Sequence, residues 1–212
     1  MTNTWKKILE ENCTKIEHDI LGFSFEDCTV LKRALLRSAA YKDQRFPVEL
    51  KEIGFQNGLD TFGDKILDIA IYDHFMDNFL CYQNLGKKKL RGIINGHREW
   101  YSRNEILQEF SLKCITLQDY IVWGTDEFDK KIWNKPTIEI LADCFEALVG
   151  SIYKDQGIIG VKKMLEKIDY FEKIDDLRFN KGQKKVDFHI LEKILKFWGS
   201  DAHRGTSPRR VG

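Results

Sequence analysis

LDTFGDKILD at residues 59–68 and LADCFEALVG at residues 141–150 are the two stretches that decide the fold. Each places two carboxylates three or four residues apart inside an apolar pattern with helical spacing, so each pair shares one face of a helix. A carboxylate on an apolar face is costly unless a positive charge meets it. Four of them converging would suit Mg²⁺, which prefers oxygen ligands. The four carboxylates are Asp60, Asp64, Asp143 and Glu146.

Small residues near these carboxylates favour a close approach of the two helices. Gly63 lies between the aspartates of the first stretch, and Ala142 and Ala147 flank the acids of the second. The alternative interpretation is a solvated acidic face, which is the usual environment of such pairs. The apolar residues around both pairs strengthen the case for a metal site, and both interpretations stay open at this point.

The composition is that of an ordinary globular protein with one domain and extensions, or with two small domains. Of the 212 residues, 42% are hydrophobic and 32% are charged, and only three are proline, which allows long helices. The formal net charge of +1 provides no global basic field. Binding to nucleic acid would therefore have to come from local patches.

The cysteine pattern and the N-terminal residues indicate an intracellular protein. Five scattered cysteines form no Cys-x-x-Cys motif, which indicates reduced cysteines in the core. The histidines do not pair with them at the spacing of zinc ligands, so a zinc site is not expected. No apolar run is long enough to span a membrane. The first twenty residues carry four acids, unlike a secretory or mitochondrial leader. We expect the cytoplasm or the nucleus.

The hydrophobic periodicity predicts an all-α chain with few strand patterns and no internal repeat. Residues 41–57 are expected to form a loop, residues 114–137 an irregular segment, and Gly157 a helix end. Asp27 is expected to cap the second helix. Helices are predicted at residues 4–20, 27–35, 58–80, from Lys87 onward, and at 102–113, 138–154, 159–171 and 186–197.

Four motifs in order make the chain resemble the ribonuclease III family. They are LGFSF at residues 21–25 followed by Leu31, Ala34 and Leu35, GLDTFGDKILD at 58–68, KLR at 89–91 with Ile93, Ile94 and Asn95, and LADCFEALVGSIYKD at 141–155. The last motif is the closest to the family pattern. The resemblance covers residues 21 to about 170 with the family's order and spacing.

The resemblance implies an all-α endonuclease domain that cleaves double-stranded RNA as a homodimer. Asp60, Asp64, Asp143 and Glu146 stand where the family's metal-binding carboxylates stand, with Asp64 and Glu146 as the indispensable catalytic residues. They would hold Mg²⁺, for which Mn²⁺ could substitute, and the ion would activate a water molecule. The family's products carry a 5′-phosphate and a two-nucleotide 3′ overhang.

The resemblance also divides the chain into three parts. We expect an N-terminal helical extension at residues 1–20, the ribonuclease III catalytic domain at 21–172, and a basic, partly disordered C-terminal extension at 173–212. The family's double-stranded RNA-binding domain is about seventy residues long, and no matching pattern follows residue 172. We therefore expect a minimal, Dicer-like processor of small-RNA precursors or structured RNA. Its RNA-binding residues would be Lys87, Lys88, Lys89, Arg91, Asn95, Lys184 and Lys185.

The first acidic stretch departs from the family pattern at three positions. Asn57 replaces a glutamate, and Asp60 replaces another glutamate with a shorter side chain. Thr61 replaces the aromatic residue that enters the partner subunit in the family. Thr61 and Phe62 are the expected dimer interface, with Phe62 or Phe55 taking the place of that aromatic residue.

These departures leave two alternatives open. One is a non-catalytic ribonuclease III-like RNA-binding protein with a ribosome-associated or assembly role. The other is a helical interaction domain that does not bind RNA.

Overall fold

Helices are the dominant secondary structure of the residues that the structure describes, which are 2–78, 87–134 and 136–180. This computed structural model contains no strand in those segments, and β-type pairing there is limited to one isolated bridge between Leu36 and Val122. The all-α prediction is confirmed. The helix predicted at 186–197 and most of the predicted C-terminal extension lie outside the described residues.

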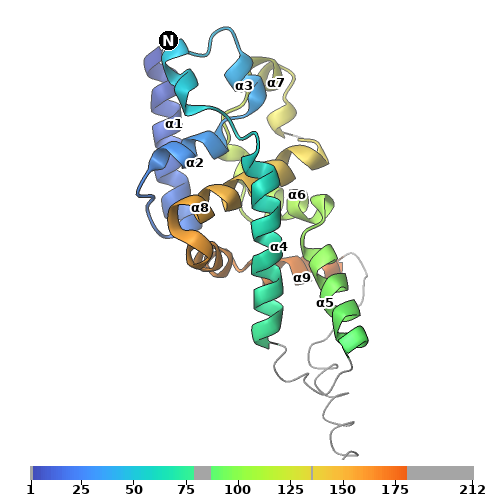
Figure 1. Cartoon of the computed structure of the whole chain (residues 1–212). Coiled ribbons are helices and arrows are strands. Elements are labelled where there is room, and N and C mark those ends of the chain that lie inside the picture. The colour runs from blue at the N-terminus through green and yellow to red at the C-terminus, as the bar shows by residue number, and fades with distance from the viewer. Residues whose placement is uncertain (1, 79–86, 135, 181–212) are drawn as a thin grey trace, which may run out of the picture.

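The helices of the described segments follow one another as Figure 1 shows. They are α1 (Thr2–Ile16), α2 (Cys28–Leu35), α3 (Ser38–Lys42), α4 (Leu59–Asn78), α5 (Lys87–Tyr101), α6 (Asn104–Lys113), α7 (Thr125–Asp129), α8 (Ile138–Lys167) and α9 (Tyr170–Asn180). A π-helical turn follows α1 at Glu17–Leu21. Short 3₁₀ helices lie at Val48–Ile53, Leu117–Asp119 and Ile132–Asn134.

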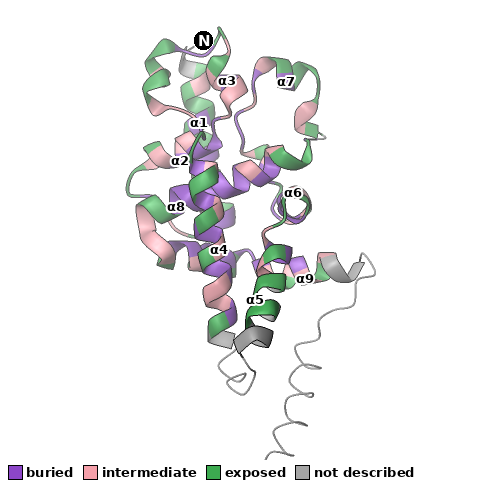
Figure 2. Cartoon of the chain, turned by 45° about the vertical axis from the view of Figure 1, so that its right-hand side comes forward, coloured by how far each residue is buried: buried purple, intermediate pink, exposed green. Residues whose placement is uncertain are grey.

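Helix α8 forms the centre of the main hydrophobic core. Between Leu141 and Ile152 every residue is buried except Asp143, which is half-buried. The helix contacts α2, α4, α6 and α9. Figure 2 shows the buried residues concentrated on α8 and on the facing part of α4. A segment that is apolar on nearly every side has to be surrounded, and this explains its central position.

Two glycines bring α4 and α8 into backbone contact. A Cβ atom added at Gly63 would collide with the backbone carbonyl group of Glu146, and one added at Gly150 would collide with the carbonyl oxygen of Leu59. A side chain at either position would push the two helices apart. The sequence pointed to Gly63 as a small residue of this contact, but the matching role of Gly150 is visible only in the structure.

Several predicted boundaries agree with the structure. The carboxylate of Asp27 accepts a hydrogen bond from the backbone N–H of Thr29 at 2.8 Å and caps α2 as predicted. Gly157 interrupts α8 with a left-handed backbone (φ 64°), so the predicted break is present. The predicted loop at 41–57 contains the end of α3 and a 3₁₀ turn.

Helix α9 begins where the sequence predicted the end of a helix, and it continues beyond residue 172. Tyr170 and Ile174 are fully buried, and the hydroxyl of Tyr101 donates a hydrogen bond to Asp175 at 2.7 Å. The ring of Tyr170 stacks on Phe145 of α8 with centroids 5.6 Å apart. Because these contacts join segments that are far apart in the sequence, no local pattern could predict them. The division of the chain at residues 20 and 172 stays a prediction.

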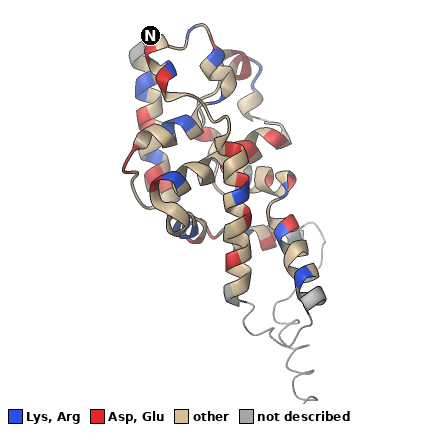
Figure 3. Cartoon of the chain, in the orientation of Figure 1, with Lys and Arg blue, Asp and Glu red and all other residues tan. Residues whose placement is uncertain are grey.

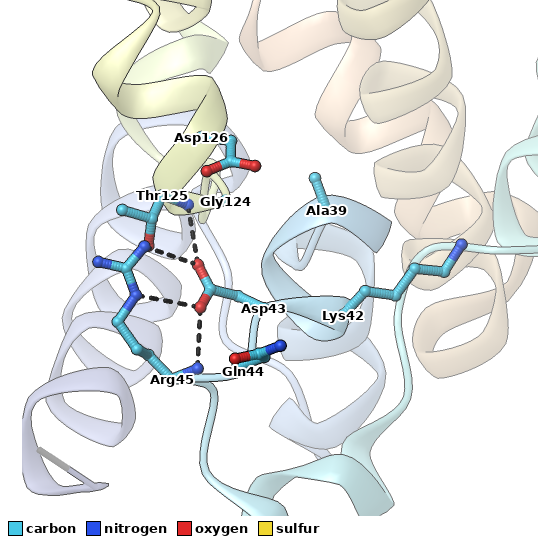
Figure 4. Close-up of a pocket in the computed structure, with 8 residues that line it drawn as sticks. All are labelled: Ala39, Lys42, Asp43, Gln44, Arg45, Gly124, Thr125 and Asp126. Atoms are coloured by element: carbon cyan, nitrogen blue, oxygen red, sulfur yellow. Dashed lines mark hydrogen bonds and ion pairs between the residues drawn. The ribbon is translucent and has the colours of Figure 1, made fainter.

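Asp43 joins the end of α3 to the start of α7, as Figure 4 shows. Its carboxylate accepts hydrogen bonds from the backbone N–H groups of Arg45 at 2.8 Å and of Thr125 at 3.2 Å. Hydrogen bonding, first to Thr125, holds the pKa of Asp43 well below its usual range. The adjoining surface hollow, about 540 Å³ in volume, is lined by none of the four carboxylates predicted to bind metal.

No helix in the described segments has the length and apolarity needed to cross a membrane. The cysteines of those segments, Cys13, Cys28, Cys114 and Cys144, are all free thiols. The compartment of the protein stays a prediction.

Replacing Gly63 with alanine should strongly destabilise the protein. The added methyl group meets the rigid backbone of α8, so the free energy of unfolding should fall by roughly 3 kcal/mol, the upper part of the usual overpacking range. Urea denaturation measures this change. The matched control is Gly92→Ala, at an exposed position of α5 where nothing lies within 4 Å of the added Cβ. The control should gain up to about 1 kcal/mol from helix propensity. A Gly63→Ala protein as stable as the wild type would contradict the close crossing.

Candidate active site

The four carboxylates identified from the sequence lie where α4 and α8 cross. Asp60 and Asp64 are one turn apart on α4, and Asp143 and Glu146 lie on the buried part of α8. Figure 3 shows acidic residues, coloured red, on the ribbons of both α4 and α8. The fold therefore brings together two stretches that are about eighty residues apart in the chain.

Glu146 is the most buried of the four, with 8% of its surface exposed. Burial raises its pKa to about 8, and the negative charges of Asp64, Asp143 and Asp60 add to the rise. Within the described segments, no hydrogen bond or ion pair reaches its carboxyl group. A buried carboxyl group without a partner holds a proton at neutral pH unless a cation replaces that proton.

Asp143 is also affected by its neighbour on α4. Its pKa is raised first by burial and then by the charge of Asp60, while the charge of Arg37 acts in the opposite direction. Among the neighbouring charges, Asp64 has the largest effect on Glu146 and Asp60 the largest on Asp143. Each acid of α8 is thus coupled most strongly to one aspartate of α4.

The aspartates of α4 make contacts of their own. Asp64 accepts a hydrogen bond from the ammonium group of Lys65 at 2.6 Å, and Asp60 accepts one from the backbone N–H of Thr61 at 2.7 Å. In residues 2–78, 87–134 and 136–180, no three histidine, cysteine, aspartate or glutamate side chains are grouped closely enough to hold a metal ion. Joint binding of one ion by the four carboxylates stays a prediction.

The chemistry of the four side chains fits a hard divalent cation. Carboxylate oxygens are the ligands that Mg²⁺ prefers, and a cation relieves the repulsion between crowded acids. The Lys65 side chain is 68% exposed, and an ion pair of this kind contributes little stability. Asp64 can therefore turn from Lys65 toward a cation at small cost.

Sequence reasoning missed a buried ion pair beside this site. The guanidinium of Arg37 donates two hydrogen bonds to one carboxylate oxygen of Glu127, at 2.8 and 2.9 Å. The other oxygen of Glu127 accepts a hydrogen bond from the backbone N–H of Gly124. Arg37 also lies over the ring of Trp123, 5.4 Å from its centroid. Because the two charged residues are 90 positions apart, no local pattern could reveal the pair.

The predicted RNA-binding residues are only partly described. Helix α5 begins at Lys87 as expected. Arg91 and Asn95 are exposed and four residues apart, and Asn95 accepts a hydrogen bond from the hydroxyl of Tyr72 on α4 at 3.0 Å. The side chains of Lys87, Lys88 and Lys89, and the whole of Lys184 and Lys185, lie outside the described part of the chain.

The predicted dimer-interface residues are on the surface. Thr61 is exposed, and Phe62 is 37% exposed while its ring packs edge-on against Tyr153 at a centroid distance of 5.5 Å. Ile69 and Met76 are also exposed and follow Phe62 at intervals of seven residues on α4. This spacing forms an apolar stripe along the helix. Its role as a dimer interface stays a prediction.

A comparison with known families decides the relationship. A family profile described as Ribonuclease-III-like matches residues 29–170. The chain belongs to the ribonuclease-III-like family. The match extends from α2 to the first residue of α9 and includes both acidic stretches.

Ribonuclease 3 proteins of bacteria are similar to the chain over most of its length. Ribonuclease 3 of Streptococcus uberis is 26% identical over 186 residues, which cover 81% of this chain and 75% of that protein. Ribonuclease 3 of Listeria monocytogenes is 25% identical over 173 residues, which cover 82% of this chain and 65% of that protein.

Solved structures support the fold. The nuclease domain of ribonuclease III from Campylobacter jejuni superimposes with a TM-score of 0.57 at 20% identity, over 74% of this chain and 93% of that one. A second structure of that domain gives a TM-score of 0.52 at 21% identity, over 74% of this chain and 97% of that one. This second structure concerns flexibility in the region involved in that domain's dimer formation.

The three departures noted in the first acidic stretch, Asn57, Asp60 and Thr61, lie at the start of α4 or just before it. Asn57 precedes the helix, and its backbone carbonyl accepts a hydrogen bond from Arg33 at 2.9 Å. Gly58 follows with a left-handed backbone (φ 78°), and Asp60 and Thr61 form the first turn. The second acidic stretch, on α8, is buried except for the half-buried Asp143.

Replacing Glu146 with glutamine should stabilise the protein at alkaline pH in EDTA. The pKa of Glu146 is raised from 4.5 to about 8, so wild-type stability should fall as the pH rises through that window. Glutamine mimics the neutral acid and avoids this loss. Each unit of pKa shift corresponds to about 1.4 kcal/mol, so the gain should be on the order of a few kcal/mol at about pH 9. Thermal unfolding across the pH range measures it.

The control for this prediction is Glu166→Gln, which changes an exposed glutamate of the same helix. Its effect on stability should not grow between about pH 5 and about pH 9. A Glu146→Gln advantage that shrinks as the pH rises would contradict the raised pKa of Glu146.

Proposed function

We propose that the chain is a Mg²⁺-dependent endoribonuclease that cleaves double-stranded RNA. The family and the fold support an endoribonuclease acting on double-stranded RNA in general. The observation that carries the finer proposal is the unpartnered, buried carboxyl group of Glu146 next to Asp64 and Asp143. Such a site costs stability, and the cost is offset when a cation binds.

The proposed roles follow from position. Asp60, Asp64, Asp143 and Glu146 hold the cation, Mg²⁺ or Mn²⁺, and Asp64 and Glu146 are the catalytic pair. A divalent ion held there would lower the pKa of a water molecule and stabilise the leaving 3′ oxygen. A bound cation would favour the ionised form of Glu146, whose pKa burial and the neighbouring acids raise in its absence. The buried backbone contact at Gly63 keeps the acids of the two helices opposite each other.

The proposed enzyme acts as a homodimer. Two sites, each cutting one strand, would leave a 5′-phosphate and a two-nucleotide 3′ overhang, as the family resemblance implies. The exposed side chains of Thr61 and Phe62 on α4 are the proposed contact with the second copy. The Campylobacter domain, which has a region involved in dimer formation, supports this proposal by similarity of fold.

The proposed RNA contacts lie on α5. Arg91 is an exposed cation and Asn95 an exposed amide on that helix. Lys87, Lys88, Lys89, Lys184 and Lys185 complete the proposed set. Contacts of this kind hold the phosphate backbone and the 2′-hydroxyls without reading sequence. Processing of small-RNA precursors or of structured RNA is the proposed biological role.

Replacing Asp64 with asparagine should abolish cleavage. Wild-type protein with Mg²⁺ should cut long double-stranded RNA, and the variant should be slower by at least about 100-fold, since even residues that only support a metal ligand are worth about 10- to 100-fold. Gel analysis of single-turnover reactions measures the rates. The matched control is Asp129→Asn, which changes an exposed aspartate of α7 and should cut at the wild-type rate.

Equal rates for the wild type and Asp64→Asn would contradict the assigned site. Duplex binding without cleavage in either Mg²⁺ or Mn²⁺ would support the non-catalytic RNA-binding alternative. No duplex binding at low salt, where phosphate contacts are strongest, would contradict any role on RNA.

A further inference from the structure

Two basic side chains lie against the acidic face of α4. The ammonium of Lys65 contacts Asp64 at 2.6 Å. The guanidinium of Arg98, on α5, contacts Asp68 at 2.9 Å through one of its terminal nitrogens. Asp64 and Asp68 are one turn apart, so both cations border the same row of acids. Asp64, Lys65 and Asp68 lie inside the motif at residues 58–68, whereas Arg98 lies outside the motifs that carried the family resemblance.

The two ion pairs are close enough to influence each other. The pKa of Lys65 is raised, first by its hydrogen bond to Asp64, and the charge of Arg98 acts against this rise. The pKa of Arg98 is raised, first by its hydrogen bond to Asp68, and the charge of Asp64 contributes. The cations therefore form one group beside the proposed metal-binding acids.

Both cations keep hydrogen-bonding capacity. The Nε atom of Arg98 is buried without a hydrogen-bond partner in the described segments, and so is the Oδ1 atom of Asp68. A guanidinium carries five N–H donors and an ammonium three, far more than these two contacts use. The side chains of Lys65 and Arg98 are 68% and 34% exposed, so an anion can reach them from solvent.

A phosphate of RNA needs positive charge at this place. The row Asp60, Asp64 and Asp68 lies on α4, and Asp143 and Glu146 lie on α8, so one divalent cation does not neutralise all of these acids. An approaching phosphodiester would be repelled unless further cations lay beside the acids. Lys65 and Arg98 are the described cations in direct contact with this row.

We propose that Lys65 and Arg98 together bind a phosphate group of the RNA backbone next to the carboxylates. The inference rests on the proposed function and adds a phosphate subsite to it. Asp68 is a positioning residue, because its ion pair fixes the guanidinium on the side of α4. Lys65 exchanges Asp64 for the phosphate when Asp64 turns to the cation. A guanidinium and an ammonium that contact aspartates one turn apart on α4 suit the oxygens of one phosphate.

The test uses the Glu146→Gln protein, in which cleavage is blocked and Lys65, Arg98 and Asp68 are intact. The dissociation constant for a fluorescently labelled RNA duplex is measured with Mg²⁺ over a series of salt concentrations. Lys65→Ala and Arg98→Ala should each weaken binding and reduce the slope of log K against log salt by about 1, as expected for loss of one phosphate contact. In the Lys65→Ala/Arg98→Ala double variant, this slope should be reduced by about 2.

The matched control is Lys163→Ala, an exposed lysine on the far part of α8, which should leave affinity and slope unchanged. Lys65 is exposed, so its replacement tests the inference without a risk to folding. Replacing Arg98 alone leaves the charge of Asp68 unpaired. The thermal melting of the Arg98→Ala variant is therefore compared with that of the Asp68→Ala/Arg98→Ala double variant, which leaves no unpaired charge behind.

The Asp68→Asn variant separates two effects of Asp68, its role in fixing Arg98 in place and its negative charge. Loss of a negative charge alone would strengthen binding to an anion, whereas loss of the group that fixes Arg98 would weaken it. Weaker binding supports the positioning role, and equal or tighter binding overturns it. Duplex binding with unchanged slopes for Lys65→Ala and Arg98→Ala overturns the phosphate subsite alone. Absence of duplex binding by the parent protein overturns the proposed function together with it.

Discussion

The backbone contact between Gly63 of α4 and Gly150 of α8 is the constraint on which the rest of the structure depends. It brings two long helices closer than any other pair of residues would allow. Because Asp64 follows Gly63 directly and Glu146 lies one turn before Gly150, the same contact sets the acids against each other. Fold and candidate site thus have one geometric origin.

The acids at the crossing of α4 and α8 lower the stability of the fold, although they are the residues proposed to bind the cation. Burial, together with the neighbouring acids, raises the pKa of Glu146 to about 8, so in the absence of a cation the folded state loses stability as this group ionises. The buried apolar residues of α8, together with the aromatic cluster of Phe110, Phe145 and Tyr170, provide the stability that offsets this loss. A loss of stability at one polar site inside an apolar core is typical of functional sites.

Local patterns in the sequence predicted those features that depend on neighbours in the chain. Helical periodicity located α4 and α8, the Asp27 cap and the break at Gly157 were visible as local signals, and the spacing of the acids predicted two polar faces. The ion pairs of Arg37 with Glu127 and of Asp68 with Arg98 join segments 90 and 30 residues apart, so periodicity could not reveal them. The same holds for α9, which is stabilised by burial of Tyr170 and Ile174 against distant helices.

The central claim is that the acids of α4 and α8 bind one divalent cation between them. Anomalous diffraction from crystals grown with Mn²⁺ tests this most directly, because the anomalous signal locates the ion without reference to activity. We expect a peak between the carboxylates of Asp64 and Glu146, with Asp143 or Asp60 completing the oxygen ligands of the ion. A peak elsewhere on the molecule, or none at saturating Mn²⁺, would contradict this claim.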